Sequence, residues 1–369
     1  MKTNEHHFPG SKIKFLLTKL NSLFNYGFID ALKRLATLGL NRLPIPISFN
    51  ALKMFIMGIA AMCIFSAQAE YPEKPIKIIV PYPAGGTTDL LIRLVAPKLS
   101  ERLQQPIFIE NRAGAGGILG SQVVAKSPAD GYTLVFGSIA THGILPAIQK
   151  PPPFDPIRDF TPISLFASTP NVFLVNASSP IKNLEDLISQ AKSKPNQFSF
   201  GSTSLGGSPH MSGELLKNMT KINLLHVPYK GGSPMLVDLM GGQISVGIDN
   251  LPSSIQFIRS GRLRALAVTT TKRWPTAPEI PTMVEAGVPG YESSAWFGLL
   301  APANTPKHVI DVLQKQIQEL LKTPEVEKAY LEQGALAIGS SPDEFSKFIT
   351  AEMKKWSQVV NENGLKLDQ

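Results

Sequence analysis

The sequence predicts an α/β protein built from two lobes. From residue 76 onward, short apolar runs rich in β-branched residues alternate with segments of helical periodicity, as in parallel β-α-β units. Glycine- and proline-rich turns separate these segments. A second series of the same kind starts at Phe198, and strand-like passages near Thr169 and Trp296 join the two series. Two such passages indicate two α/β lobes with a double hinge.

The first series is expected to contain three strands and two helices before a long strand. The helix over 89–103 is amphipathic, and its expected inner side carries Leu90, Leu91, Leu94, Val95 and Leu99. A long strand follows over 163–175 and is expected to break at Pro170, because proline cannot donate to a strand ladder. The other expected elements are a strand at 76–80, a strand at 107–110, a helix at 117–125 and a strand at 132–137.

The second series and the C-terminal part follow the same rules. We expect strands at 198–201, 223–227, 245–249, 263–268 and 296–301, and helices at 182–194, 209–219 and 234–240. Three further helices are expected at 306–321, 324–333 and 342–360, each opened by a proline, which the first helical turn tolerates. The lobe boundaries that follow are 70–170 with 297–369 for the first lobe, and 171–296 for the second.

Residues 1–69 are expected to be an N-terminal extension that ends in a signal peptide. Met54–Phe65 is an uncharged apolar run preceded by Lys53, and Ser66–Ala69 has the small residues of a signal peptidase site. A membrane anchor is the alternative, but the run falls short of the roughly 20 apolar residues that span a bilayer. We therefore expect export, with cleavage after Ala69. The 50 residues before the apolar run are unusually long for the basic region of a signal.

Charge and cysteine content exclude several classes of function. The formal net charge is +8, but residues 1–69 contain eight Lys or Arg against Glu5 and Asp30 and hold most of the excess. The remaining chain carries 28 basic and 26 acidic side chains and lacks the basic excess of a nucleic-acid-binding domain. The single cysteine, Cys63, also precedes residue 70, so the remaining chain has no disulfide, thiolate nucleophile or cysteine-ligated metal.

The strongest local signal is a glycine-containing turn between the first strand and the first helix. Its residues from Ala84 to Gly86 can expose successive backbone N–H groups, and the helix directs the positive end of its dipole to the same place. A carboxylate is the expected anion; a plain tight turn is the alternative. A phosphate fits less well. The sequence has no G-x-x-x-x-G-K-[ST] motif, and the cluster Gly114–Gly120 has Leu119 where a dinucleotide fingerprint needs its third glycine.

A second loop rich in glycine and serine opens a helix between Gly201 and His210. Its hydroxyls and free amides would place many hydrogen-bond donors at the edge of a binding site. A serine hydrolase is an alternative, although no G-x-S-x-G elbow is present. His210 and Glu214 are spaced to share a metal, but a contact on the helix surface is the commoner arrangement. Polar residues also follow strand ends at 138–142, 229–232 and 249–250, where a shared cleft would be lined.

With these residues in view, the chain resembles the Bug-type (TctC-like) receptors of tripartite tricarboxylate transporters. The similarity runs from Tyr71 to the C-terminus. It rests on an ordered series of stretches: IIVPYPAGGTTD, IENRAGAGG, DGYTLVFGS, THGI, FDPIRDFTPIS, HVPYKGG, IDNLPS, LRALAVTT and WFGLLAPANTP. The resemblance implies a type II periplasmic-binding-protein fold, with one ligand held between two α/β lobes that are joined by two crossings.

The resemblance also implies a set of ligand-binding residues. In the first lobe, a loop braced by Asp89 would hold a ligand carboxylate through backbone amides and ordered waters. Tyr82 and Pro83 depart from the family pattern, in which Phe and a small residue are commoner, so the identity of the ligand stays open. The implied ligand-binding residues are Ala84, Gly85, Gly86, Asp89, Ser138, Thr141 and His142 in the first lobe, and Ser202, Thr203, Gly206, Ser208 and, near the distal end of the ligand, Asp249 in the second.

The function implied by the resemblance is that of a periplasmic receptor. Such a receptor closes its lobes around a small carboxylate and delivers it to membrane permease subunits. No catalytic residue, metal, cofactor or nucleic-acid partner is expected, and the protein is expected to be a monomer. A periplasmic serine hydrolase and a ligand-sensing receptor for a signalling system are the alternatives.

Overall fold

The computed structural model describes residues 71–364. The N-terminal extension, the signal peptide and the cleavage site after Ala69 all lie outside the described residues. Within the described range, none of the helices has the length and apolar character needed to cross a bilayer.

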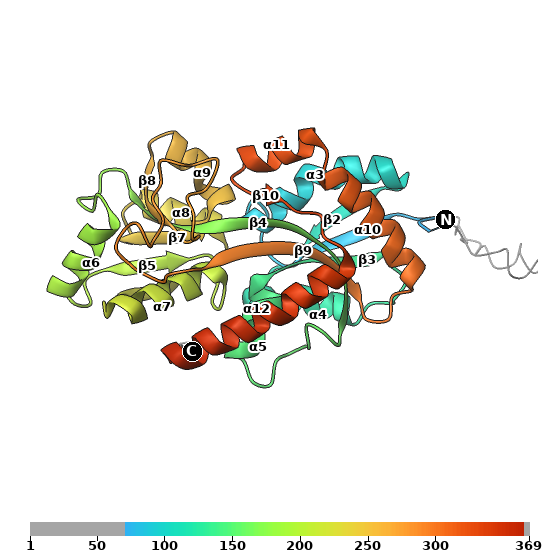
Figure 1. Ribbon diagram of the computed structural model, residues 1–369, viewed down its shortest axis with the longest axis horizontal. Helices are drawn as coiled ribbons and strands as arrows, with labels where there is room; N and C mark the ends of the chain where they lie inside the picture. The colour runs from blue at the N-terminus through green and yellow to red at the C-terminus, as the bar shows by residue number, and fades with distance from the viewer. Residues whose placement is uncertain (1–70, 365–369) are drawn as a thin grey trace, which may run out of the picture. The chain divides into compact units, whose positions relative to one another are not determined.

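A mixed β-sheet runs through the described chain, with helices packed on its faces (Figure 1). The strand order is β2-β1-β3-β9-β4-β7-β5-β6, and β8 and β10 both pair with β4 off this path. The strands are β1 (Ile76–Val80), β2 (Ile107–Asn111), β3 (Thr133–Ser138), β4 (Phe160–Asn176), β5 (Ser199–Ser202), β6 (Leu225–Pro228), β7 (Val246–Asn250), β8 (Leu263–Val268), β9 (Ser294–Pro302) and β10 (Leu336–Ala337).

The helices follow the strands in the alternating order expected of β-α-β units. The α-helices are α3 (Thr87–Leu103), α4 (Ile118–Ala125), α5 (Leu145–Ile148), α6 (Leu184–Ser193), α7 (Ser208–Thr220), α8 (Gly232–Met240), α9 (Leu251–Arg259), α10 (Lys307–Leu321), α11 (Pro324–Glu332) and α12 (Pro342–Asn363). A 3-10 turn, η1 (Ala115–Gly117), precedes α4, and a turn of π-helix, η2 (Ala140–Ile144), follows β3.

Two long strands, β4 and β9, run side by side and join two α/β lobes (Figure 1). The first part of β4, up to Pro170, pairs with β9, and its last part, from Asn171, pairs with β7 and β8. Parallel pairs lie on either side: β1 pairs with β2 and β3, and β5 pairs with β6 and β7. The predicted α/β class, with parallel β-α-β units in two lobes, is confirmed.

Separate apolar cores support the division into two lobes. One core is built around Phe136, Phe166 and Phe345, and the others lie among residues of the second series, including Phe173 and Leu239. Each core excludes water from one face of its part of the sheet. The exact boundaries at residues 170/171 and 296/297 stay a prediction.

Two expectations about individual elements were wrong. The long strand β4 continues through Pro170 instead of breaking there. Pro170 lies where β4 changes its partner from β9 to β7, a position at which a missing ladder donor costs little. Helix α9 was not expected, because its nine residues start at Leu251 directly after a strand and leave little periodic pattern to recognise.

Candidate functional site

A pocket lies between the lobes, beyond the ends of the strands. Its lining is made of glycines, prolines and small hydroxyl-bearing residues, and no lining residue is Lys, Arg or His. The first lobe contributes Tyr82, Pro83, Ala84, Gly86, Thr87, Thr88, Ser138, Ile139, Ala140 and Phe297; the second contributes Thr203, Ser204, Gly207, Ser208, Pro209, Gly231, Gly232, Ser233, Pro234, Asp249 and Asn250.

Four helices begin at this pocket. The N-cap residues are Gly86 of α3, Gly207 of α7, Gly231 of α8 and Asn250 of α9, and all four line the pocket. None of them provides a side-chain hydrogen bond to its helix. The first N–H groups of a helix have no partner within the helix, and the helix dipole makes this end positive. The pocket therefore offers hydrogen-bond donors and positive potential without a cationic side chain, which suits a carboxylate.

Asp89 holds the loop between β1 and α3 in place. Its carboxylate accepts hydrogen bonds from Gly85 N (2.9 Å), Asn111 Nδ2 (2.9 Å) and Arg93 Nε (2.7 Å). Asn111 Nδ2 also donates to the carbonyl oxygen of Tyr82, at 3.0 Å. Burial opposes ionisation of Asp89, but these hydrogen bonds and the charge of Arg93 outweigh it and lower the pKa of the carboxyl. The loop is thus tied to an ionised carboxylate on the first turn of α3.

This arrangement corrects the expected role of Gly85. Its N–H is used by Asp89, so only Ala84 and Gly86 of the three expected amide donors line the pocket. Gly85 instead serves the turn, because its φ of +80° is a conformation that other residues rarely adopt.

Replacing Asp89 with alanine is expected to lower the free energy of unfolding by about 1–3 kcal/mol, because the Gly85 N–H, the Asn111 amide and the Arg93 guanidinium all lose their acceptor. Urea denaturation at pH 7 measures this. Arg93→Gln is the matched control, since its half-exposed guanidinium is screened by water and its loss is expected to cost at most about 1 kcal/mol. Equal losses in the two variants would show that Asp89 does not brace the loop.

Ser138 and Tyr82 form the side of the pocket next to this loop. The Tyr82 hydroxyl lies 2.8 Å from Ser138 Oγ, and burial raises the pKa of Tyr82 to about 12. Ser138 N donates to Thr141 Oγ1 at 3.2 Å. Of the expected pair Ser138 and Thr141, only Ser138 reaches the pocket.

Thr141 and His142 lie behind the pocket and do not line it. The η2 turn directs both side chains into the first lobe, where their exposed fractions are 1% and 0%. Thr141 Oγ1 lies 2.8 Å from Nδ1 of His142, and the imidazole packs against Phe154 and Phe160, whose rings also contact each other. Its Nε2 is among the few buried side-chain nitrogen or oxygen atoms of the described residues without a hydrogen-bond partner. Burial lowers the pKa of His142 to about 3. These two side chains do not line the pocket, and the expectation that they stand beside the ligand stays a prediction.

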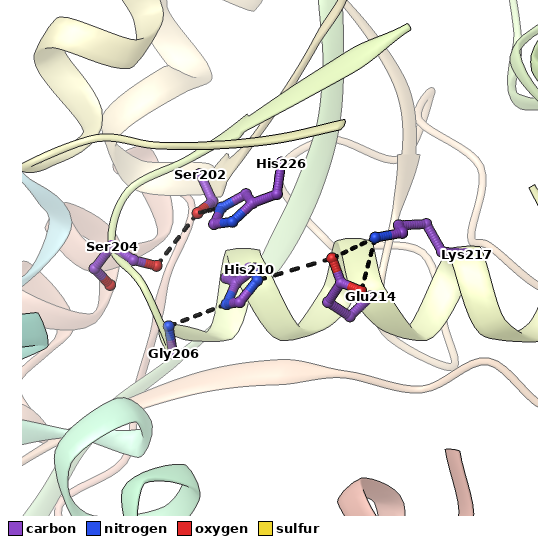
Figure 2. A network of polar contacts seen from close by, with 7 residues as sticks. All are labelled: Ser202, Ser204, Gly206, His210, Glu214, Lys217 and His226. Carbon is purple, nitrogen blue, oxygen red and sulfur yellow. Dashed lines mark hydrogen bonds and ion pairs between the residues drawn. The ribbon is translucent and has the colours of Figure 1, made fainter. Parts of the chain in front are cut away.

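In the second lobe, Thr203, Ser208 and Asp249 line the pocket, whereas Ser202 and Gly206 lie behind it. Ser202 is fully buried, and its Oγ lies 2.7 Å from His226 Nε2 and donates to the carbonyl oxygen of Ser204 (Figure 2). A hydroxyl enclosed in this way cannot reach a substrate, so the Ser202–His226 contact has no nucleophilic role. Among the described residues, no cluster of three or more His, Cys, Asp or Glu side chains is arranged to hold a metal.

Asp249 is the single Asp or Glu of the pocket lining. Its Oδ2 accepts from Ser253 Oγ (2.6 Å) and its Oδ1 from Asn250 N (2.8 Å). Thr87 Oγ1, at the start of α3 in the first lobe, lies 3.2 Å from Ser253 Oγ, so a chain of hydrogen bonds crosses from one lobe to the other. Burial raises the pKa of Asp249 to about 6 even though these bonds favour the charged form.

Several pocket residues were missed by the sequence analysis. The loops at 229–232 and 249–250 had been expected to help line a shared cleft, but of their residues only Asp249 had been assigned to the ligand. A stronger signal was available, since Ser233-Pro234 and Leu251-Pro252 carry the proline that marks a first helical turn. Phe297 carries no such signal, because an apolar residue in a strand is normally part of the core.

Comparisons with known proteins show what this chain is similar to. The model of the tripartite tricarboxylate transporter family receptor matches residues 91–365. BugT of Bordetella pertussis is 38% identical over 302 residues, which cover 80% of this chain and 91% of BugT. Rpa4515 of R. palustris, solved with adipate, is 39% identical with a TM-score of 0.78, over 80% of this chain and 99% of that one. MatC (Rpa3494) from Rhodopseudomonas palustris, solved with bound malate, is 31% identical with a TM-score of 0.75, over 79% of this chain and 100% of that one.

These likenesses cover nearly the whole described chain. They confirm the type II periplasmic-binding-protein fold, with two α/β lobes and a pocket between them. Receptors of this family are periplasmic solute-binding proteins and not enzymes. The chain belongs to the family of tripartite tricarboxylate transporter receptors, the Bug-type (TctC-like) solute-binding proteins.

Proposed function

We propose that this protein captures a small carboxylate between its lobes and delivers it to the membrane subunits of a tripartite tricarboxylate transporter. One observation carries the proposal: four helix N-termini without side-chain caps meet at a pocket whose lining has no cationic side chain. Adipate and malate are bound by two solved relatives, and both are dicarboxylates. We infer that the ligand of this chain belongs to the same chemical class.

The ligand-binding residues that we propose are those that line the pocket and carry donors. Ala84 and Gly86 would donate through their backbone amides, while Ser138, Thr203 and Ser208 would donate through their hydroxyls. Asp249 would face the distal part of the ligand. Asp89 acts from behind the pocket by holding the loop.

Closure would bring the two lobes together by rotation about β4 and β9, with lobe boundaries at 170/171 and 296/297. Binding favours the closed state only as far as the ligand interacts better with it than with the open state. A ligand that contacts both lobes would provide that difference, whereas the contact of Thr87 with Ser253 stabilises the closed state whether or not a ligand is bound. We further propose export by the signal segment, cleavage after Ala69 and a monomeric receptor in the periplasm.

A thermal-shift screen tests ligand binding. Adipate, malate and other dicarboxylates are compared with monocarboxylates and with the corresponding diamides, which keep the shape and lack the charge. At about 100 times Kd, a ligand stabilises the folded state by about 2.7 kcal/mol and raises Tm by several degrees. The proposal is wrong if no carboxylate raises Tm and native mass spectrometry finds no acid retained by freshly purified protein. Delivery is tested by radiolabelled uptake in cells with and without the gene for this chain.

A further inference from the structure

A network of polar side chains lies behind the second-lobe loop of the pocket (Figure 2). The loop of residues 203–207 connects β5 to α7 and places Thr203, Ser204 and Gly207 on the pocket lining. The network joins this loop to His210 and Glu214 of α7 and to His226 of β6. None of the three last-named side chains lines the pocket, so direct ligand contact does not explain them.

His210 anchors the middle of the loop. Its Nδ1 accepts a hydrogen bond from the backbone N–H of Gly206, at 3.0 Å. Gly206 has a φ of +71°, and Gly207 N donates back to the carbonyl oxygen of Ser204 at 3.3 Å. The loop thus makes a tight turn, and the backbone N–H at the centre of that turn, that of Gly206, is the one bound by His210. A side chain on the helix that follows the loop determines where the loop lies.

The neighbours of His210 keep its ring in one orientation. The imidazole stacks on that of His226 with 3.9 Å between ring centroids and 14° between planes, and His226 in turn stacks on Phe200. On the opposite edge, Nε2 of His210 lies 3.8 Å from Glu214 Oε1. Lys217 holds that carboxylate through bonds of 2.8 and 2.9 Å. A flipped ring would place the Cδ2–H group against the N–H of Gly206 and would move Nε2 away from the Glu214 carboxylate.

We propose that His210 is a positioning residue for the ligand pocket, whose unprotonated Nδ1 fixes the 203–207 loop with its amides and hydroxyls toward the ligand. The role of His210 in ligand binding rests on the proposed function, whereas its anchoring of the loop does not. An imidazole that accepts on Nδ1 carries its proton on Nε2 and is neutral. A protonated ring would place an N–H against the N–H of Gly206.

The surroundings of the ring favour this neutral form. His210 is 3% exposed at its side chain, and burial, followed by the neighbouring His226 and Lys217, lowers its pKa to about 3. Glu214, on the same helix, is the opposing charge, and Phe200 of β5 is uncharged. The acceptor is therefore kept at acidic pH values at which an exposed imidazole is already charged.

Two substitutions separate the loss of the hydrogen-bond acceptor from the loss of the ring. His210→Asn keeps an oxygen close to the position of Nδ1, and His210→Leu has no acceptor. Amide hydrogen exchange of Gly206 is measured by NMR in the ligand-free protein. We expect exchange at least about tenfold faster in His210→Leu than in the wild type, and within about threefold of the wild type in His210→Asn. The proposal would be overturned if the Gly206 amide exchanged at the same rate in all three proteins, or if both variants lost the same amount of protection from exchange.

Binding of the carboxylate probes adipate and malate supplies the second readout. We expect Kd to rise about tenfold in His210→Leu and to be restored in His210→Asn. If exchange at Gly206 follows the acceptor but neither the wild type nor any variant binds a carboxylate, the proposed function fails and the anchoring stands. Should His210→Leu not fold, 15N NMR of the wild-type imidazole decides: a proton on Nδ1 at pH 7 would refute the anchor.

Discussion

Gly86→Val is expected to weaken carboxylate binding at least about 100-fold, which corresponds to about 2.7 kcal/mol. Gly86 is the N-cap of α3 and lines the pocket. Its φ of −80° and ψ of 166° are extended values that valine adopts readily. A Cβ added there meets only the carbonyl oxygen of Pro83, at 3.7 Å. The side chain would therefore leave the fold intact while it fills the pocket and covers the first amides of α3.

Isothermal titration with an acid found in the thermal screen measures this loss, and Tm checks the fold. Gly86→Ala is expected to fall between the wild type and Gly86→Val, since its methyl group covers less of the helix end. Gly241→Ala, at the C-terminal end of α8 and outside the pocket lining, serves as the control, because its Cβ makes only ordinary contacts. Unchanged affinity in a folded Gly86→Val protein would mean that the α3 end is not the carboxylate site.

Gly85 and Gly86 differ in backbone conformation, which the sequence alone does not reveal. In the printed sequence Gly85 and Gly86 look alike, and both were expected to donate to a ligand. The structure separates them, because Gly85 has a positive φ and gives its N–H to Asp89, while Gly86 is extended and starts the helix. A substitution at Gly85 would strain the turn itself and would not report on binding.

Local patterns were enough to predict most elements, because strands and helices of this chain carry clear periodicity. The anion-binding turn after β1 was also predictable, since the preceding strand, the glycines and the following helix are adjacent in the sequence. Asp89 lies in the same segment, and its bracing contacts with Gly85 and Arg93 are local.

The remaining part of the site depends on long-range packing. Whether the side chains after β3 face the ligand or the core depends on the η2 turn, whose π-helical geometry has no signature in ATHGI. His142 therefore looked like a ligand contact in the sequence, and in the structure its side chain is buried in the first lobe. Phe297 reaches the pocket only because β9 lies between β3 and β4. No local pattern contains that information.

The second large effect concerns the free energy of unfolding at acidic pH, and it arises because His142 is buried. The folded pKa is about 3, and the pKa of an exposed histidine is about 6.5, so below pH 6.5 the unfolded chain binds a proton that the folded chain does not. Stability from this group is complete above pH 6.5 and is lost as the pH falls toward 3. Between pH 7 and pH 5 the loss is about 2 kcal/mol.

His142→Leu is expected to remove this part of the pH dependence. Urea denaturation at pH 7 and pH 5 yields the change in unfolding free energy for each protein, and the change in the variant should be smaller than that in the wild type by about 2 kcal/mol. Other titrating groups cancel from this difference, because His210 and Asp249 are present in both proteins. The raised pKa of Asp249 increases the free energy of unfolding as the pH falls, which is opposite to the effect of His142. His308→Gln, at an exposed position of α10, controls for the loss of a histidine as such. Identical pH dependence in the wild type and His142→Leu would mean that His142 is hydrated or paired in the folded protein, and the orphaned Nε2 would then have a partner.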